Sequence, residues 1–172
     1  MSVNSKGRHF LYCKRYRAKF IRHSKCNDTI ARVLKYAGIS STLEPTGLYN
    51  SDGKRLDDLT MIPWKRREFL TWDYSCIDPL NINKDAIIDT EANKLAKYSP
   101  SLPANYTFLP LIATILTLFG SHTLTFFKEL GKRISARTED PNEGFHLRQR
   151  LAINIIKYNY LSFIHSMSEA PN

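Results

Sequence analysis

Cysteine is scarce in this sequence, and long apolar segments are absent. The three cysteines, Cys13, Cys26 and Cys76, are odd in number and far apart, so they argue against a disulfide framework and favour a reducing, intracellular compartment. The first ten residues lack the apolar run of a secretory signal. Residues 108–127 are the one candidate for a membrane span, but proline, glycine and several threonines interrupt them. A buried strand that runs into a helix explains this segment better, so we expect no membrane association.

Acidic residues are almost missing from the first 36 positions. Ten lysines and arginines lie there against one acid, Asp28, and the whole chain has a net charge of +9. Four aromatic residues are interleaved with these cations, a mixture that suits phosphate contacts combined with stacking. We therefore expect a nucleic-acid partner, DNA with RNA as an alternative; the other interpretation is a solvated arm that only keeps the protein soluble. The residues expected to contact nucleic acid are Lys14, Arg15, Arg17, Lys19, Arg22 and Arg55.

Turn residues and apolar periodicity divide the 172-residue chain into the elements of one domain, without internal repeats. Asn27 and Asp28 are good residues to start a helix, and Gly38 is a typical stop. A basic turn at 65–67 joins two runs rich in aromatic and β-branched residues, which predicts a hairpin. The predicted order of helix, three strands, helix, strand, helix, helix indicates an α/β sandwich. The predicted ranges are 27–37 (helix), 41–48, 56–64 and 68–77 (strands), 84–98 (helix), 106–116 (strand), and 122–137 and 143–166 (helices).

Two aspartates on the predicted hairpin form the candidate site. Asp57 opens the first strand and Asp73 lies inside the second, so antiparallel pairing would bring their carboxylates together. Carboxylate oxygens are the ligands that Mg²⁺ and Mn²⁺ prefer, and such an ion would polarise a phosphodiester and activate a bound water. A nearby lysine would neutralise charge on the phosphate. The alternative is that these acids form only structural ion pairs with Lys54 or Arg55.

Several short motifs follow one another along the chain. They are RHSKCND shortly before ARVLKYAGI, GKRLDD at 53–58, WDYS at 72–75, KLAKY at 94–98, PLIATILTLFG, and LRQRLAINIIKYN. In this order and spacing they resemble the restriction-like endonuclease domain of site-specific non-LTR retrotransposons, a branch of the PD-(D/E)XK nucleases. The resemblance covers roughly residues 8–165. It implies a restriction-endonuclease-like sandwich of a helix, a three-stranded meander, a helix and a strand, here with two extra C-terminal helices.

The resemblance also implies an activity and the residues that carry it. The activity is that of a retroelement-derived DNA endonuclease that depends on Mg²⁺ or Mn²⁺ and acts in the nucleus. Asp57 falls on the aspartate of the PD pair and Asp73 on the second acidic position, and both would hold the metal. In this branch the lysine is displaced onto the following helix. Lys97 is the preferred match for it and Lys94 is the alternative.

Three positions depart from the pattern of this family. Leu56 replaces the usual proline, Asp58 replaces the usual glycine, and Thr114 lies near a position where relatives tend to have an acid after the buried strand. These changes leave open a second function, that of a catalytically degenerate nucleic-acid-binding module with the same fold. His23, near the start of the first predicted helix, is interpreted as a helix cap, with a phosphate contact as the alternative.

The resemblance divides the chain into a basic N-terminal arm (1–22), a nuclease domain (23–166) and a short tail (167–172). His9 and Cys13 have the spacing of the last two ligands of a zinc knuckle, which often precedes the nuclease in related proteins. A structural zinc site needs four such ligands, and nothing clearly supplies the other two. We therefore interpret the arm as a remnant of a knuckle and do not expect zinc. The sequence gives no indication of the oligomeric state.

Overall fold

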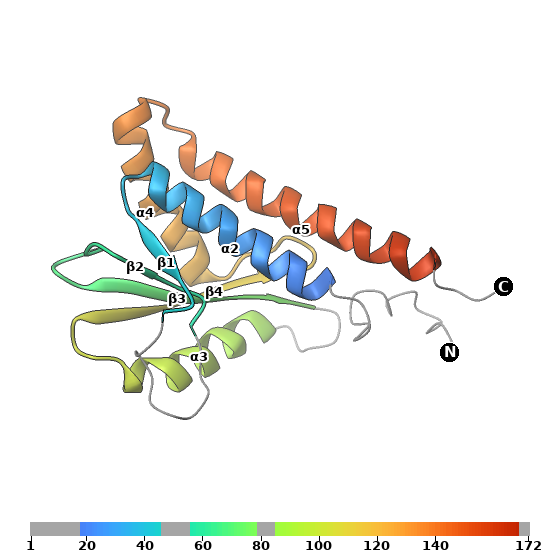
Figure 1. Cartoon of the computed structure of the whole chain (residues 1–172), viewed down its shortest axis with the longest axis horizontal. Coiled ribbons are helices and arrows are strands. Elements are labelled where there is room, and N and C mark those ends of the chain that lie inside the picture. The colour runs from blue at the N-terminus through green and yellow to red at the C-terminus, as the bar shows by residue number, and fades with distance from the viewer. Residues whose placement is uncertain (1–17, 46–55, 79–84, 169–172) are drawn as a thin grey trace.

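The computed structural model describes residues 18–45, 56–78 and 85–168, and the elements are labelled in Figure 1. They follow one another in a mixed α/β order, as the sequence predicts. The helix predicted at 84–98, the strand predicted at 106–116 and the two C-terminal helices are all present. The elements are α2 (Ala18–Tyr36), β1 (Ser41–Leu43), β2 (Asp58–Thr60), β3 (Phe69–Ile77), α3 (Ala86–Tyr98), the short 3₁₀ helix η1 (Ser99–Ser101), β4 (Tyr106–Thr114), α4 (Ser121–Thr138) and α5 (Glu143–Ser168).

The four strands form one mixed sheet in the order β1-β2-β3-β4. β1, β2 and β3 are antiparallel neighbours, whereas β4 runs parallel to β3. The predicted hairpin is confirmed: Arg66 and Arg67 adopt positive φ angles of 42° and 71° in its turn. The backbone N–H of Glu68 closes this turn by donating to the carbonyl of Lys65 at 2.6 Å. Because parallel neighbours need a long crossover, α3 lies in the connection from β3 to β4.

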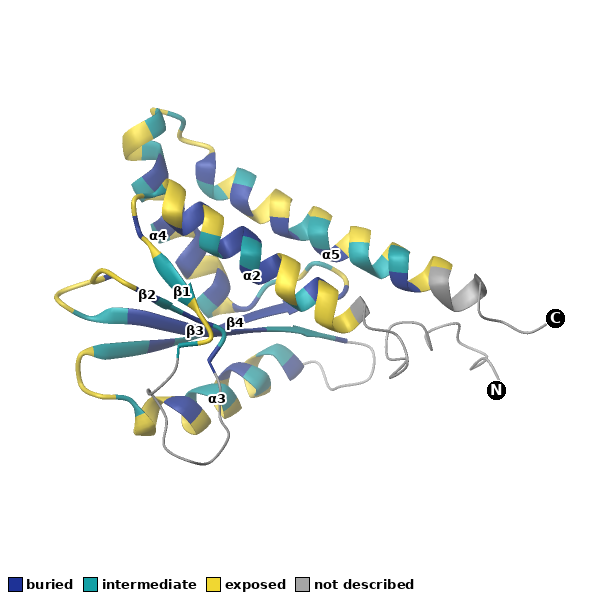
Figure 2. Ribbon diagram, viewed as in Figure 1, coloured by how far each residue is buried: buried dark blue, intermediate teal, exposed yellow. Residues whose placement is uncertain are grey.

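Helices cover both faces of the sheet. α3 lies on one face and contacts β4, whereas α2 and α4 lie on the other face, and α5 packs against both of them (Figure 1). The main core lies on the side of α2, α4 and α5, and buried positions run along β3 and β4 (Figure 2). A smaller apolar cluster of Leu56, Tyr98 and Phe108 lies on the side of α3. The sheet is therefore held between two apolar layers.

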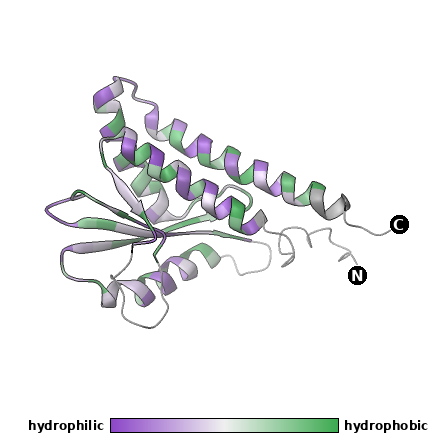
Figure 3. Cartoon of the chain, in the orientation of Figure 1, coloured by the Kyte–Doolittle hydropathy of each residue, from purple (hydrophilic) through white to green (hydrophobic). Residues whose placement is uncertain are grey.

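Apolar residues at helical spacing explain the two C-terminal helices. In α4, Phe126, Phe127, Leu130 and Ile134 recur at intervals of one, three and four residues, and all four are buried. Hydrophobic and hydrophilic residues alternate along both α4 and α5 (Figure 3). The segment at 108–127 is the end of β4 followed by the start of α4, so its interpretation as a strand that runs into a helix is confirmed.

The predicted start of the first helix is wrong. The sequence places it at Asn27, but α2 extends back at least to Ala18. The buried face of α2 includes Arg22 and Asn27 among its apolar residues, and these polar side chains conceal the helical period. α2 therefore runs across the predicted boundary between the arm and the domain. β1 and β2 are also shorter than predicted, and residues 46–48 of the first predicted strand lie outside the described residues.

Candidate metal centre

The β2–β3 pairing brings Asp57 and Asp73 together. The backbone N–H of Asp57 donates to the carbonyl of Trp72 at 3.0 Å, so Asp57 extends this pairing by one residue beyond β2. Asp73 follows Trp72 in β3. The Asp57 carboxylate accepts a further hydrogen bond from the backbone N–H of Tyr74 at 2.5 Å, which fixes its orientation. The two carboxylates therefore approach one another from neighbouring strands, in the way the sequence predicts.

His23 joins these carboxylates from helix α2. Its Nε2 lies 3.2 Å from Oδ2 of Asp57. Ligand atoms of His23, Asp57 and Asp73 all lie within 4.8 Å of one another, so the three side chains could hold a metal ion. Among the residues that the structure describes, this is the one such group. The interpretation of His23 as a helix cap is wrong, because α2 begins several residues before it.

Lys94 on α3 is the lysine at this site. Its Nζ donates to Oδ2 of Asp73, and only 15% of its side chain and 13% of that of Asp73 are exposed. Lys97 lies one turn further on, where its Nζ donates to the hydroxyl of Tyr98 at 3.1 Å and lies 4.6 Å from the centre of the Tyr98 ring. The structure therefore corrects the preference for Lys97. Two lysines three residues apart occupy neighbouring helix faces, and Lys94 is on the face from which its side chain reaches Asp73 of β3.

While His23 is neutral, the charges of the site favour a bound cation. Two carboxylates lie close together and mostly buried, and Lys94 supplies one positive charge against them. The hydrogen bond with Asp57 raises the pKa of His23 above its ordinary value of 6.5, and the charge of Asp73 adds to this rise, although burial opposes it. The donor set of two carboxylates and one imidazole is one that divalent ions accept.

The structure accounts for two of the departures from the family pattern. Leu56 is 2% exposed and belongs to the smaller apolar cluster. Asp58 is fully buried and lies on the other side of the strand from Asp57, where its carboxylate accepts hydrogen bonds from the backbone N–H of Leu59 at 2.8 Å and the hydroxyl of Ser41 at 3.3 Å. Burial raises the pKa of Asp58 to about 6, and the nearby charge of Asp57 adds to the rise. Neither residue blocks the paired carboxylates.

Glu91 is a buried acid on the same helix as Lys94, and no motif of the sequence singles it out. It lies on α3, one turn before Lys94, and is 4% exposed. Its carboxylate accepts hydrogen bonds from the hydroxyl of Ser121 at 2.9 Å and the backbone N–H of His122 at 3.1 Å. Glu91 thereby accepts hydrogen bonds from the N-terminus of α4 and links α3 to that helix. Its spacing from Lys94 could have placed it on a neighbouring helix face, but no sequence signal indicates its partners.

The predicted nucleic-acid contacts have different positions. Lys19 is exposed on α2. Arg22 is only 3% exposed and donates to Oδ1 of Asn159 on α5 at 2.5 Å, so it is a buried structural residue and its prediction as a phosphate contact is corrected. The other predicted contacts lie outside the described residues, as do the two residues of the zinc-knuckle remnant. They are Lys14, Arg15, Arg17 and Arg55, and His9 and Cys13.

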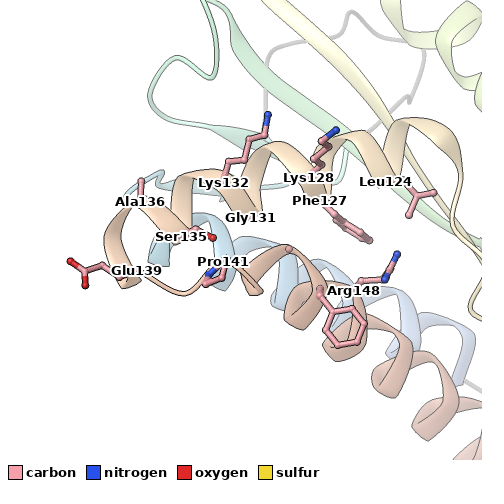
Figure 4. Close-up of a pocket in the computed structure, with 12 residues that line it drawn as sticks. Leu124, Phe127, Lys128, Gly131, Lys132, Ser135, Ala136, Glu139, Pro141 and Arg148 are labelled. Carbon is pink, nitrogen blue, oxygen red and sulfur yellow. The ribbon is translucent and has the colours of Figure 1, made fainter.

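A pocket lies away from the carboxylates, between α4 and α5. It has a volume of about 740 Å³ and is lined in part by Phe127 and Phe145. In Figure 4, Lys128 and Lys132 extend from α4, and Arg148 extends from α5. None of the residues of the candidate centre lines this pocket. Its size alone therefore does not connect it to the chemistry of Asp57 and Asp73.

Any statement about the function of this protein rests on the geometry of its site. No protein-family model matches the chain, and a search of curated proteins also found no match. None of the described helices combines the length and the apolar character that crossing a membrane requires. The fold and the site define a mixed α/β protein with a paired-carboxylate centre that could hold a metal ion.

Proposed function

We propose that this chain is a divalent-metal-dependent endonuclease domain of the restriction-like type, derived from a retroelement, which hydrolyses phosphodiester bonds of DNA. The observation that carries the proposal is the convergence of Asp57, Asp73 and Lys94 from three different elements. These residues are distant in sequence, and each matches a position that the family resemblance assigns to catalysis.

The order of the elements supports the same proposal. The family resemblance implies a helix, a three-stranded meander, a helix and a strand. The chain has α2, then β1 to β3 in antiparallel order, then α3 and the parallel strand β4. Asp57 lies directly before β2, Asp73 lies within β3, and Lys94 lies on α3.

In the proposed reaction, Asp57 and Asp73 would hold the ion, whose chemistry would be to polarise the scissile phosphate and to lower the pKa of an attacking water. Lys94 provides a positive charge beside Asp73, where negative charge develops on the phosphate oxygens. The backbone N–H of Tyr74 keeps the Asp57 carboxylate in place. The basic residues of α2 would attract the phosphate backbone, and the exposed Lys19 is the one predicted contact on that helix that remains accessible.

Nicking of supercoiled plasmid by the purified protein tests this proposal. With Mg²⁺ or Mn²⁺ we expect nicking, which Asp73→Asn abolishes and EDTA prevents. Lys94→Ala should lower the rate by about 10²-fold or more, the scale at which removing one transition-state donor acts. Lys97→Ala removes the same charge from the next turn of α3 and should leave the rate nearly unchanged. Circular dichroism of each variant would establish that the fold is retained.

The assay also decides between the endonuclease and a degenerate binding module. Nicking that persists in Asp73→Asn would contradict the assignment of the centre. DNA or RNA binding without nicking in either metal would favour the binding module. Absence of nucleic-acid affinity even at low salt would contradict both functions, because a polyanion contact is common to them.

A further inference from the structure

Four side chains form a chain of polar contacts that ends on Asp57. Trp72 Nε1 donates to Oδ1 of Asn27 at 3.3 Å. Nδ2 of Asn27 lies 3.5 Å from Nδ1 of His23, and Nε2 of His23 lies 3.2 Å from Oδ2 of Asp57. We infer that this series of contacts makes His23 a hydrogen-bond donor that positions Asp57, and that His23 is not a ligand of the metal. The inference rests on the proposed function only in taking Asp57 as a metal ligand.

The direction of hydrogen-bond donation along this series of contacts follows from its first side chain, Trp72. The indole N–H of Trp72 can only donate, and Trp72 is fully buried, so Asn27 must present its oxygen to it. The amide nitrogen of Asn27 then faces His23, and this group is also a donor. Nδ1 of His23 therefore accepts. Because a neutral imidazole has one donor and one acceptor nitrogen, Nε2 carries the hydrogen and donates it to Asp57.

A metal-ligating role for His23 would require the opposite arrangement. A metal binds the lone pair of a nitrogen, so Nε2 would lose its hydrogen and Nδ1 would carry it. That hydrogen would point at the amide N–H of Asn27. Rotation of the Asn27 amide does not resolve the conflict, because its nitrogen would then face the indole N–H of Trp72. Asn27 is only 4% exposed, which leaves little room for water to mediate.

The consequence is a centre in which the ion meets oxygen ligands only. His23 and the backbone N–H of Tyr74 both meet Oδ2 of Asp57, and Lys94 meets Oδ2 of Asp73. Among the contacts that the described residues make, Oδ1 of each aspartate remains for the ion. Oxygen ligands without nitrogen select hard ions such as Mg²⁺ and Mn²⁺, and they disfavour Zn²⁺ and other ions that prefer imidazole.

The tautomer of His23 can be measured directly in the metal-free protein. Long-range ¹H–¹⁵N spectra at alkaline pH distinguish a hydrogen on Nε2 from one on Nδ1, and the His23→Gln variant assigns the signal. We expect the Nε2–H form for His23, and we expect Asn27→Leu to weaken this preference, because it removes the amide donor. The Nδ1–H form in the unmodified protein would overturn the inference. This measurement does not depend on any activity.

Binding of Mn²⁺ provides a second readout. Pulsed electron paramagnetic resonance should show no directly bound imidazole nitrogen. His23→Gln keeps an N–H donor and should retain Mn²⁺ affinity within a few-fold. His23→Leu should lower it about 10-fold or more, the scale expected when a metal ligand loses the hydrogen bond that orients it. A coupled nitrogen that disappears in His23→Gln would overturn the inference. If Mn²⁺ does not bind at all, the proposed function fails, and the tautomer measurement still tests the role of His23.

Discussion

Replacement of Asp58 by asparagine is expected to stabilise the metal-free protein at neutral pH. Asp58 is fully buried in β2, and its carboxylate has two hydrogen-bond donors, the backbone N–H of Leu59 and the hydroxyl of Ser41. These donors do not offset the loss of hydration, because burial raises the pKa of Asp58 from its ordinary value of 3.8 to about 6. Asparagine can accept from Leu59 with its oxygen and donate to Ser41 with its nitrogen, so it keeps both contacts without a charge.

The magnitude and the sign follow from the two pKa values of Asp58. A difference of about two pKa units corresponds to about 3 kcal/mol between the protonation states. Between pH 3.8 and about 6 the unfolded chain has lost the proton that the folded chain still holds, so this residue lowers the free energy of unfolding as pH rises through that range. Below this pH range the burial of Asp58 does not lower the free energy of unfolding. Above this range it lowers the free energy of unfolding by the full amount. Asp58→Asn should therefore be up to about 3 kcal/mol more stable above pH 7, and little changed near pH 4.

Urea denaturation in EDTA across this pH range measures the effect. The quantity of interest is the difference in free energy of unfolding between the variant and the unmodified protein, because other groups titrate equally in both. Asp89→Asn is a matched control, since it removes the same charge from an exposed position in the first turn of α3. Its expected effect is small and destabilising, because an acid there interacts favourably with the helix dipole. If Asp58→Asn is less stable than the unmodified protein at pH 7.5, the cost of burying the charge of Asp58 does not exceed the benefit of its hydrogen bonds, and the prediction is refuted.

Further substitutions test the packing of α4 and the predicted nucleic-acid face. A Cβ at Gly120 would lie 2.1 Å from Oε1 of Glu91, so Gly120→Ala should lower the free energy of unfolding by about 1–3 kcal/mol; an unchanged melting temperature would show that Glu91 can move aside. Lys19→Ala should reduce the slope of log affinity for DNA against log salt by about 0.9, the effect of one phosphate contact, and an unchanged slope would remove Lys19 from the interface. Arg22→Leu should leave this slope unchanged and alter thermal stability instead, because its guanidinium is buried against Asn159.

The hairpin and its paired aspartates are the part of the site that the sequence can predict. Strand content and a basic turn place Asp57 and Asp73 on neighbouring strands, and antiparallel pairing is a local consequence of the turn. Once the pairing is known, the approach of the two carboxylates requires no information about the rest of the fold. The same holds for α3, whose boundaries follow from apolar spacing and from the prolines after it.

The contributions of the helices could not be predicted in the same way. Arg22 and Asn27 lie on the buried face of α2, and their polarity hides the period that would have extended this helix to His23. Lys94 reaches Asp73 whereas Lys97 contacts Tyr98, and which of the two lies nearer Asp73 is a property of the tertiary structure. In each case the missing information is the identity of a partner distant in sequence.

The two proposed functions make different demands on the acids. A module that only binds nucleic acid needs exposed cations, and two adjacent carboxylates beside its basic helix would repel phosphate. Burying such a pair also costs free energy that a binding surface does not require. An endonuclease needs this pair, because a divalent ion between carboxylate and phosphate turns repulsion into attraction. The proposed nuclease therefore accounts for both the positive charge of α2 and the mostly buried Asp57, Asp73 and Lys94, whereas the binding module accounts only for the first.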